Sequence, residues 1–137
     1  IRLAEKGQGR MCFLKGFDPV VANSVYAAGD LFLIPSRYEP CGLTDYIAQL
    51  LGTLPVVHHV GGLVKVIDEE TGFAYSGESV TALVRALTRA LDVYRHAPDR
   101  FKKMQQNAVE RIEQLHTWKQ VMVAYQSLYL QAMEQCP

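Results

Sequence analysis

Short apolar runs alternate with amphipathic segments over the first two-thirds of the chain. The run Leu31–Ile34 is continuous and bounded by polar Asp30 and by Pro35, which is typical of a strand buried on both faces. Together the runs predict a sheet of short strands, placed at Met11–Leu14, Leu31–Ile34, Val56 to His58 or His59, and Phe73–Tyr75.

Helix signals separate these runs and fill the last third of the chain. Asp18 before Pro19 combines an N-cap with a first helical position and predicts a helix to about Ala28. Gly52 is placed to end a second helix over 43–51. Three further helices are predicted: one after Ser79, one that Pro98-Asp99 begins, and one after Thr117. Their apolar stripes, expected to be buried, are Val80, Leu83, Val84, Leu87, Leu91 and Tyr94, then Phe101, Met104, Ala108, Ile112 and Leu115, then Trp118, Val121, Met122, Tyr125, Leu128, Tyr129 and Met133.

This alternation predicts an α/β fold in which parallel strands are joined by right-handed crossover helices, a Rossmann-like sheet ending in a helical segment over 79–137. Gly61-Gly62 interrupts the pattern after the third predicted strand. Open sheets of this kind bind ligands at the carboxyl ends of their strands. The loop after Leu31–Ile34 is therefore the place to look for chemistry.

Composition narrows the class of protein. The chain has 137 residues, 49% of them hydrophobic, and 14 basic residues against 14 acidic ones. This length suits one domain, and zero net charge argues against a nucleic-acid binder. Three widely spaced cysteines argue against a disulfide scaffold, and neither a membrane span nor a signal peptide is evident. Because no Met begins the sequence, we expect 1–137 to be one part of a longer protein.

The segment from Pro35 to Thr44 joins a predicted buried strand to a predicted helix. Glu39 is a carboxylate at the carboxyl end of the strand, where it can accept hydrogen bonds from hydroxyl groups. Gly42 lets the backbone approach a ligand closely. The N–H groups of Gly42, Leu43 and Thr44 would point out of the helix start, which favours an anion. A carboxylate that can bind hydroxyl groups, next to backbone amides that can bind a phosphate, suits a phosphorylated sugar as the ligand.

The residues of this segment are more specific to one family than the spacing of its elements is. FLIPSRY (32–38) followed by EPCGL (39–43) closely resembles the C-terminal domain of bacterial glycogen synthases and plant starch synthases, which are retaining glycosyltransferases of the two-domain GT-B type. The resemblance extends from about Arg10 to Met133. It includes GFDPVVANSVYAAGD (16–30), GTLPVVHHVGGL (52–63), ETGFAY (70–75) and TWKQVMVAYQSLY (117–129).

The resemblance implies roles for individual residues. Glu39 matches the acidic residue that binds the hydroxyls of the donor glucose. Cys41, Gly42, Leu43 and Thr44 match the loop and helix start whose amides hold the sugar and distal phosphate. Phe17 stands at the aromatic position that stacks on adenine, and a turn lining the cleft is matched by Gly61, Gly62 and Leu63.

The resemblance also implies a reaction and its setting. Glucose would move from ADP-glucose to the non-reducing end of an α-1,4-glucan with retention, without a metal or other cofactor. An N-terminal GT-B domain outside this chain would be the necessary partner, so we expect the chain alone to be inactive and to bind ADP weakly at best. No nucleic acid or membrane partner is implied. The expected location is the cytoplasm, or the plastid if the source is a plant.

Three positions depart from the family's pattern. Asp45 stands where the family usually has Gln, and its charge would repel the donor if it faced the ligand. Ile47 stands where the related E-x7-E glycosyltransferases have a second Glu, which favours the glycogen synthase branch. His58 replaces an Arg that often ends that strand.

Other interpretations remain open at the level of the sequence. Glu39 could be a surface carboxylate or the partner of Arg37, and Phe17 could belong to the core. Cys41 with His58 and His59 invites a metal hypothesis, which adjacent strand positions pointing to opposite faces make unfavourable. The simplest assignment to solvated surface covers Arg10, Lys15, Lys65 and Arg89. As a whole, the chain could instead be a non-enzymatic module that binds a nucleotide or protein, or a relative that uses UDP- or GDP-sugars.

Overall fold

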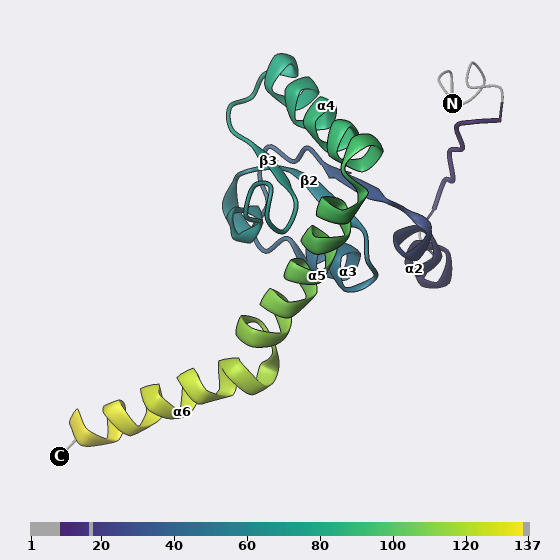
Figure 1. Ribbon diagram of the computed structural model, residues 1–137. Helices are drawn as coiled ribbons and strands as arrows, with labels where there is room; N and C mark the ends of the chain where they lie inside the picture. Colours follow the sequence, from purple (N-terminus) through teal and green to yellow (C-terminus); the bar gives the residue numbers. More distant parts are fainter. Residues whose placement is uncertain (1–8, 17, 136–137) are drawn as a thin grey trace.

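The computed structural model describes residues 9–16 and 18–135 (Figure 1). Within this part of the chain, the elements follow one another in the order α2 (Pro19–Ala28), β1 (Leu31–Ile34), α3 (Leu43–Leu50), β2 (Leu54–His58), the 3₁₀ helix η1 (Gly61–Lys65), β3 (Phe73–Tyr75), α4 (Val80–His96), α5 (Pro98–Leu115) and α6 (Trp118–Gln135).

The three strands form a parallel sheet in the order β1-β2-β3. Leu31 pairs with Leu54 across the first pair of strands, and Val56 pairs with Phe73 across the second. Parallel strands need crossover connections, which α3 and η1 supply here. The predicted α/β fold with a parallel sheet and a helical end is thus confirmed.

The central strand β2 divides the core in two. Its residues alternate between faces, so Leu54 and Val56 pack with α4 and α5, while Val57 packs on the other face with Leu63 and Val66. Every residue of β2 is buried. This rigid centre holds the loops that leave the carboxyl ends of β1 and β2.

Two predicted features of the sheet are wrong. Met11–Leu14 is not a strand: the segment is exposed and pairs with no strand that the structure describes. A strand needs a neighbour for its backbone N–H and C=O groups, and periodicity alone cannot supply one. β1 is not buried on both faces either, because Leu33 is exposed and Leu31 is only half-buried. Within the described residues β1 pairs with β2 alone, so its other edge is open.

The caps that the sequence predicts are present. Asp18 Oδ1 accepts hydrogen bonds from the backbone N–H groups of Val20 (2.8 Å) and Val21 (3.3 Å), and Ser79 Oγ accepts one from Ala82 N–H (3.1 Å). Gly52 follows α3 with φ of 87°, a left-handed conformation that suits glycine. Short polar side chains therefore determine where these helices begin.

The predicted stripe of α5 is buried as far as Ile112, but the stripes of α4 and α6 are not. In α4 the smaller residues Ala86, Ala90 and Val93 face the core, and Val80 and Val84 are exposed. Small side chains let the helix lie close to the sheet, which apolar periodicity does not predict. The α6 helix buries none of its side chains, because it extends away from the sheet beyond the end of α5 (Figure 1). In the described part of the chain, no helix is long and apolar enough to cross a membrane.

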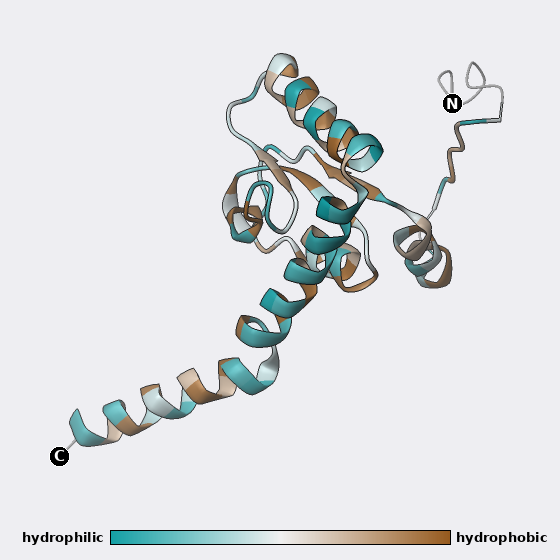
Figure 2. Ribbon diagram, viewed as in Figure 1, coloured by the Kyte–Doolittle hydropathy of each residue, from teal (hydrophilic) through white to brown (hydrophobic). Residues whose placement is uncertain are grey.

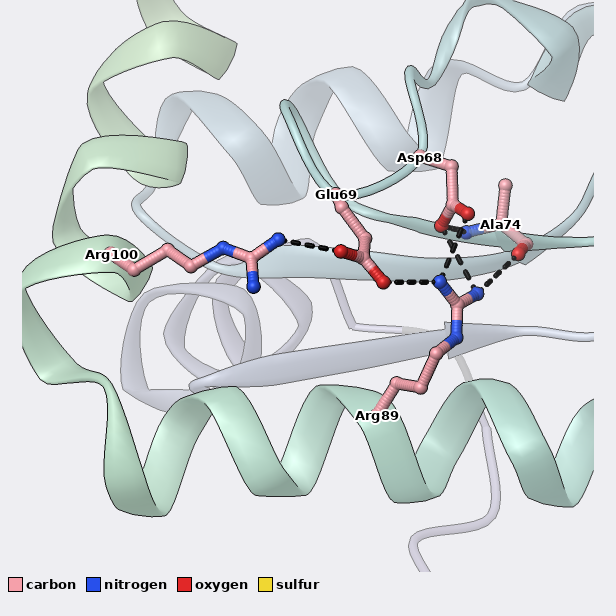
Figure 3. Close-up of polar contacts among 5 residues, drawn as sticks. All are labelled: Asp68, Glu69, Ala74, Arg89 and Arg100. Atoms are coloured by element: carbon pink, nitrogen blue, oxygen red, sulfur yellow. Dashed lines mark hydrogen bonds and ion pairs between the residues drawn. The ribbon is translucent and has the colours of Figure 1, made fainter.

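A cluster of charged groups ties the segment before β3 to α4 and α5 (Figure 3). The Arg89 guanidinium donates hydrogen bonds to Asp68 (3.0 and 3.2 Å), to Glu69 Oε1 (2.6 Å) and to the Ala74 carbonyl oxygen (2.9 Å). Arg100 of α5 donates to Glu69 Oε2 (2.5 Å). The assignment of Arg89 to solvated surface is therefore wrong, because its head group joins three segments of the fold.

Candidate functional site

Two loops meet at the carboxyl edge of the sheet. The first follows β1 and leads into α3, and it contains the predicted site residues Glu39 and Cys41–Thr44. The second follows β2 and contains Gly61–Lys65. Parallel strands bring their carboxyl ends to one edge, so segments about 20 residues apart in sequence come into contact.

Glu39 is half-buried and holds its own loop together. Its Oε1 accepts a hydrogen bond from Gly42 N–H (3.3 Å), and its Oε2 accepts one from Ser36 Oγ (3.2 Å). It does not pair with Arg37, which instead lies 3.7 Å from Glu78. A carboxylate has about four acceptor sites on its two oxygens, so both oxygens retain capacity for the hydroxyls of a ligand.

Gly42 makes the turn into α3. It is the N-cap, with φ of 67° and ψ of 57°, and no side chain caps the helix. A Cβ here would lie 2.9 Å from Leu63 Cδ2 and 3.1 Å from Asp45 Oδ1, so only glycine fits without a shift. The structure differs from expectation in one detail: the Gly42 amide is already bound to Glu39. The amides of Leu43 and Thr44 in the first turn are those left for an anion.

The Gly61-Gly62 turn presses directly against this loop. Gly62 N–H donates to the Glu39 carbonyl oxygen (2.7 Å), and a Cβ on Gly61 would overlap that same oxygen. A Cβ on Gly62 would overlap the Cys41 carbonyl group. Leu63 is fully buried against Gly42, so it supports the loop from below and has no surface of its own for a ligand.

Lys65 lies beneath the same loop, and its assignment to solvated surface is wrong. Its Nζ donates hydrogen bonds to the carbonyl oxygens of Cys41 (2.7 Å) and Gly42 (2.6 Å) and lies 3.9 Å from the centre of the Tyr46 ring. It is also 3.2 Å from Asp45 Oδ1, and only 16% of the Lys65 side chain is exposed. The sequence gives no signal for this contact, because Lys65 and Cys41 are 24 residues apart.

Asp45 explains why a lysine can occupy this place. Its side chain is fully buried and faces Lys65. The sequence led us to expect that the negative charge of Asp45 would repel a donor phosphate if it faced the ligand, and the neighbouring cation offsets that charge. Burial raises the pKa of the Asp45 carboxyl above its ordinary value of 3.8, although Lys65 pulls the pKa down. The sequence alone does not indicate this partner, because an acidic residue in the first turn of a helix is ordinary.

His58 binds the beginning of the loop that follows β1. Its ring is buried, stacks on Tyr75 at 5.1 Å, and has Nδ1 2.8 Å from the Ser36 carbonyl oxygen. A carbonyl only accepts, so Nδ1 carries the proton in this contact. His59 is exposed, as is Cys41, and the described residues contain no group of three or more His, Cys, Asp or Glu side chains that could hold a metal ion. Phe17, the predicted base-stacking residue, lies outside the described residues.

Comparison with known proteins identifies the family. The family described as "Glycosyl transferases group 1" matches residues 2–111. The chain belongs to this family. It is 40% identical over 120 residues to glycogen synthase of Streptococcus gordonii, a match that covers 82% of this chain and 25% of that protein. It is 35% identical over 140 residues to glycogen synthase of Moorella thermoacetica, covering 97% and 28%.

Solved glycosyltransferase structures share the fold. The catalytic domain of starch synthase IV from Arabidopsis thaliana, bound to ADP and acarbose, matches with a TM-score of 0.80 and 25% identity over 97% of this chain and 29% of that one. Sucrose-phosphate synthase from Thermosynechococcus elongatus matches with a TM-score of 0.73 and 29% identity over 98% and 33%. The chain thus spans about a quarter of the length of the curated relatives it matches.

Proposed function

We propose that this chain forms the donor-side part of a glucosyltransferase of the glycogen or starch synthase type. The longer protein would transfer glucose from ADP-glucose to the non-reducing end of an α-1,4-glucan with retention. One observation carries the proposal: Glu39 and the uncapped start of α3 lie side by side at the carboxyl edge of the sheet, on a loop held in place by Gly61-Gly62. The similarity to glycogen synthases supports it.

The geometry suits the charges that develop in glycosyl transfer. The nucleotide leaves as a phosphate anion, and the Leu43 and Thr44 amides at the α3 N-terminus would stabilise it. Glu39 would orient the sugar through its hydroxyls while the anomeric carbon becomes positive. No nucleophilic role is assigned to Glu39, and neither a metal nor another cofactor is part of the proposal.

The rest of the proposed enzyme lies outside this chain. An N-terminal GT-B domain would complete the cleft and bind the glucan, so the chain alone would transfer no glucose and would bind ADP weakly at best. The exposed apolar side chains of α6, including Trp118 and Met133, are surfaces that such a domain could cover. The proposed setting is the cytoplasm, or the plastid in a plant, with no nucleic acid or membrane as partner.

The test uses the full-length protein, a glycogen primer and ADP-, UDP- and GDP-glucose as donors. Glucose incorporation should be fastest from ADP-glucose. The variant Glu39→Gln keeps the size of the side chain but removes its charge, and it should lower kcat by about 100-fold, the scale on which lost transition-state contacts act. Glu113→Gln, on the exposed side of α5, is the matched control and should leave kcat unchanged.

Three outcomes would contradict the proposal in whole or in part. Transfer from none of the three nucleotide sugars would exclude this activity and favour a binding module. Undiminished transfer by Glu39→Gln would exclude the assigned role of Glu39. Preference for UDP- or GDP-glucose would keep the reaction class and change the donor.

A further inference from the structure

The ammonium group of Lys65 is directed at acceptors inside the protein. An ammonium group has three N–H donors. Three oxygens surround Lys65 Nζ, namely the carbonyl oxygens of Cys41 and Gly42 at 2.7 and 2.6 Å and Asp45 Oδ1 at 3.2 Å. Two donors bind carbonyl oxygens, and Nζ also lies against Asp45 and the Tyr46 ring, so this cation acts on the loop and not on a ligand.

The two carbonyl groups that Lys65 holds belong to functionally important peptide units. The Cys41 carbonyl shares its planar peptide with the Gly42 N–H, and the Gly42 carbonyl shares its peptide with the Leu43 N–H. In a trans peptide the C=O and N–H point in opposite directions, so fixing one fixes the other. The Gly42 N–H in turn binds Glu39 Oε1 (3.3 Å). Lys65 binds the carbonyl side of these two peptides, and their amides point the other way. It therefore fixes the direction of both amides and, through the Gly42 amide, the position of the Glu39 carboxylate.

We propose that Lys65 is a positioning residue that aims two groups at the bound nucleotide sugar: the Leu43 amide and, through the Gly42 amide bound to it, the Glu39 carboxylate. Asp45 is the counter-ion that allows the charge of Lys65 to lie beneath the loop. This inference rests on the function proposed above. It assigns to Lys65 a role in the donor site without contact with the donor, and to Asp45 only the balance of the Lys65 charge.

The surroundings of Lys65 fit a fixed ammonium group. Tyr46 presents its ring to Nζ at 3.9 Å, a cation–π contact that adds to the ion pair. A Cβ on Gly42 would lie 3.2 Å from Nζ, so glycine at the helix start also leaves room for the lysine. Neither oxygen of Asp45 accepts a hydrogen bond of good geometry from any residue that the structure describes. Asp45 therefore balances charge, whereas Lys65 makes the directional bonds.

The test separates positioning from charge balance with three variants of the full-length protein. Lys65→Met removes the ammonium and leaves Asp45 as an unpaired buried carboxylate, so both Tm and kcat should fall. Asp45→Asn keeps both carbonyl bonds of Lys65, and kcat should stay within about threefold of wild type. The double variant Asp45→Asn with Lys65→Met should recover Tm but keep kcat at least about 10-fold low, because the carbonyl bonds are still missing.

Controls and a second measurement complete the test. Lys103→Met, at an exposed position of α5, should change neither Tm nor kcat, and KM for the glucan should not move in any variant. If the double variant recovers kcat together with Tm, Lys65 merely balances charge and the proposal is overturned.

Hydrogen exchange of the Gly42 amide in the substrate-free protein tests positioning independently of activity. The amide should exchange faster in the double variant than in wild type, and equal exchange would also overturn the proposal. If wild type transfers from no nucleotide sugar, the proposed function fails, while this exchange experiment still decides whether Lys65 holds the loop.

Discussion

Gly61 lies so close to the loop above it that no side chain fits. Its φ is 50°, and a Cβ would overlap the carbonyl oxygen of Glu39. Gly52 makes a useful comparison, because its φ of 87° is also left-handed but a Cβ there would meet nothing within 4 Å. The two glycines share a conformational requirement and differ in the space around them.

Alanine substitutions should separate these two effects. Gly52→Ala should lower the free energy of unfolding by about 1–2 kcal/mol, the cost of a left-handed non-glycine residue. Gly61→Ala adds the overlap with the loop and should lower it by about 2–4 kcal/mol. Denaturant unfolding of both variants measures the difference, and equal losses would show that the loop yields to the added methyl group.

Glu69 links the segment before β3 to helices α4 and α5. This residue has φ of 60°, unusual for a side chain other than glycine, and its carboxylate bridges Arg89 and Arg100 (Figure 3). Hydrogen bonds from Arg100, and then from Arg89, lower the pKa of Glu69 below its ordinary value of 4.5. A lowered carboxyl pKa stabilises the folded state at pH values above 4.5, and this stabilisation is lost as the pH falls through the lowered pKa.

Lowering the pH should therefore reduce the stability that the Glu69 bridge contributes, and Glu69→Gln should remove this part of the pH dependence. Between about pH 5 and pH 3 the wild-type chain should lose up to about 1 kcal/mol through Glu69, a small value because the pair is partly exposed. Glu69→Gln should be less stable at pH 7 and show a shallower loss on acidification. Glu70→Gln, at the exposed neighbouring position, should retain the wild-type slope in urea unfolding at each pH. A wild-type slope in Glu69→Gln would exclude the bridge as its source.

At the scale of the whole molecule, α6 stands apart from the sheet. Figure 2 shows apolar residues along this helix, and Trp118, Tyr129 and Met133 are among those exposed. The core consists of β-strands with η1 on one face and α4 and α5 on the other. The last buried side chain before α6 is Ile112 of α5.

Removing α6 should consequently leave the core intact. A chain ending at Thr117 should have a Tm within a few degrees of the full 137 residues and should associate less at high concentration, because exposed apolar surface is lost. Ile112→Ala is the contrasting change and should lower stability by about 2–4 kcal/mol through a cavity. Thermal unfolding and light scattering measure both effects. A large fall in Tm on truncation would show that α6 packs on the body.

Local patterns predicted most of the elements. Asp18 and Ser79 cap their helices as expected, and the strands at Leu31–Ile34 and Phe73–Tyr75 have the predicted bounds. These features depend on neighbours within a few residues, which the sequence shows directly. The strand at Met11–Leu14 is wrong because pairing depends on a partner far along the chain. The predicted burial of the α4 and α6 stripes is also wrong, because burial depends on which distant elements pack against a helix.

The sequence by itself determined the order of elements, the family resemblance and the place of Glu39 and Gly42 on the loop after a strand. Only the tertiary structure decided what surrounds that loop: Gly61 and Gly62 against its backbone, His58 at its start, and Lys65 with Asp45 beneath it. Lys65 and Cys41 are 24 residues apart, and no local pattern relates them. They meet because parallel strands bring their carboxyl ends to one edge, and because a buried charge is stable only beside its partner.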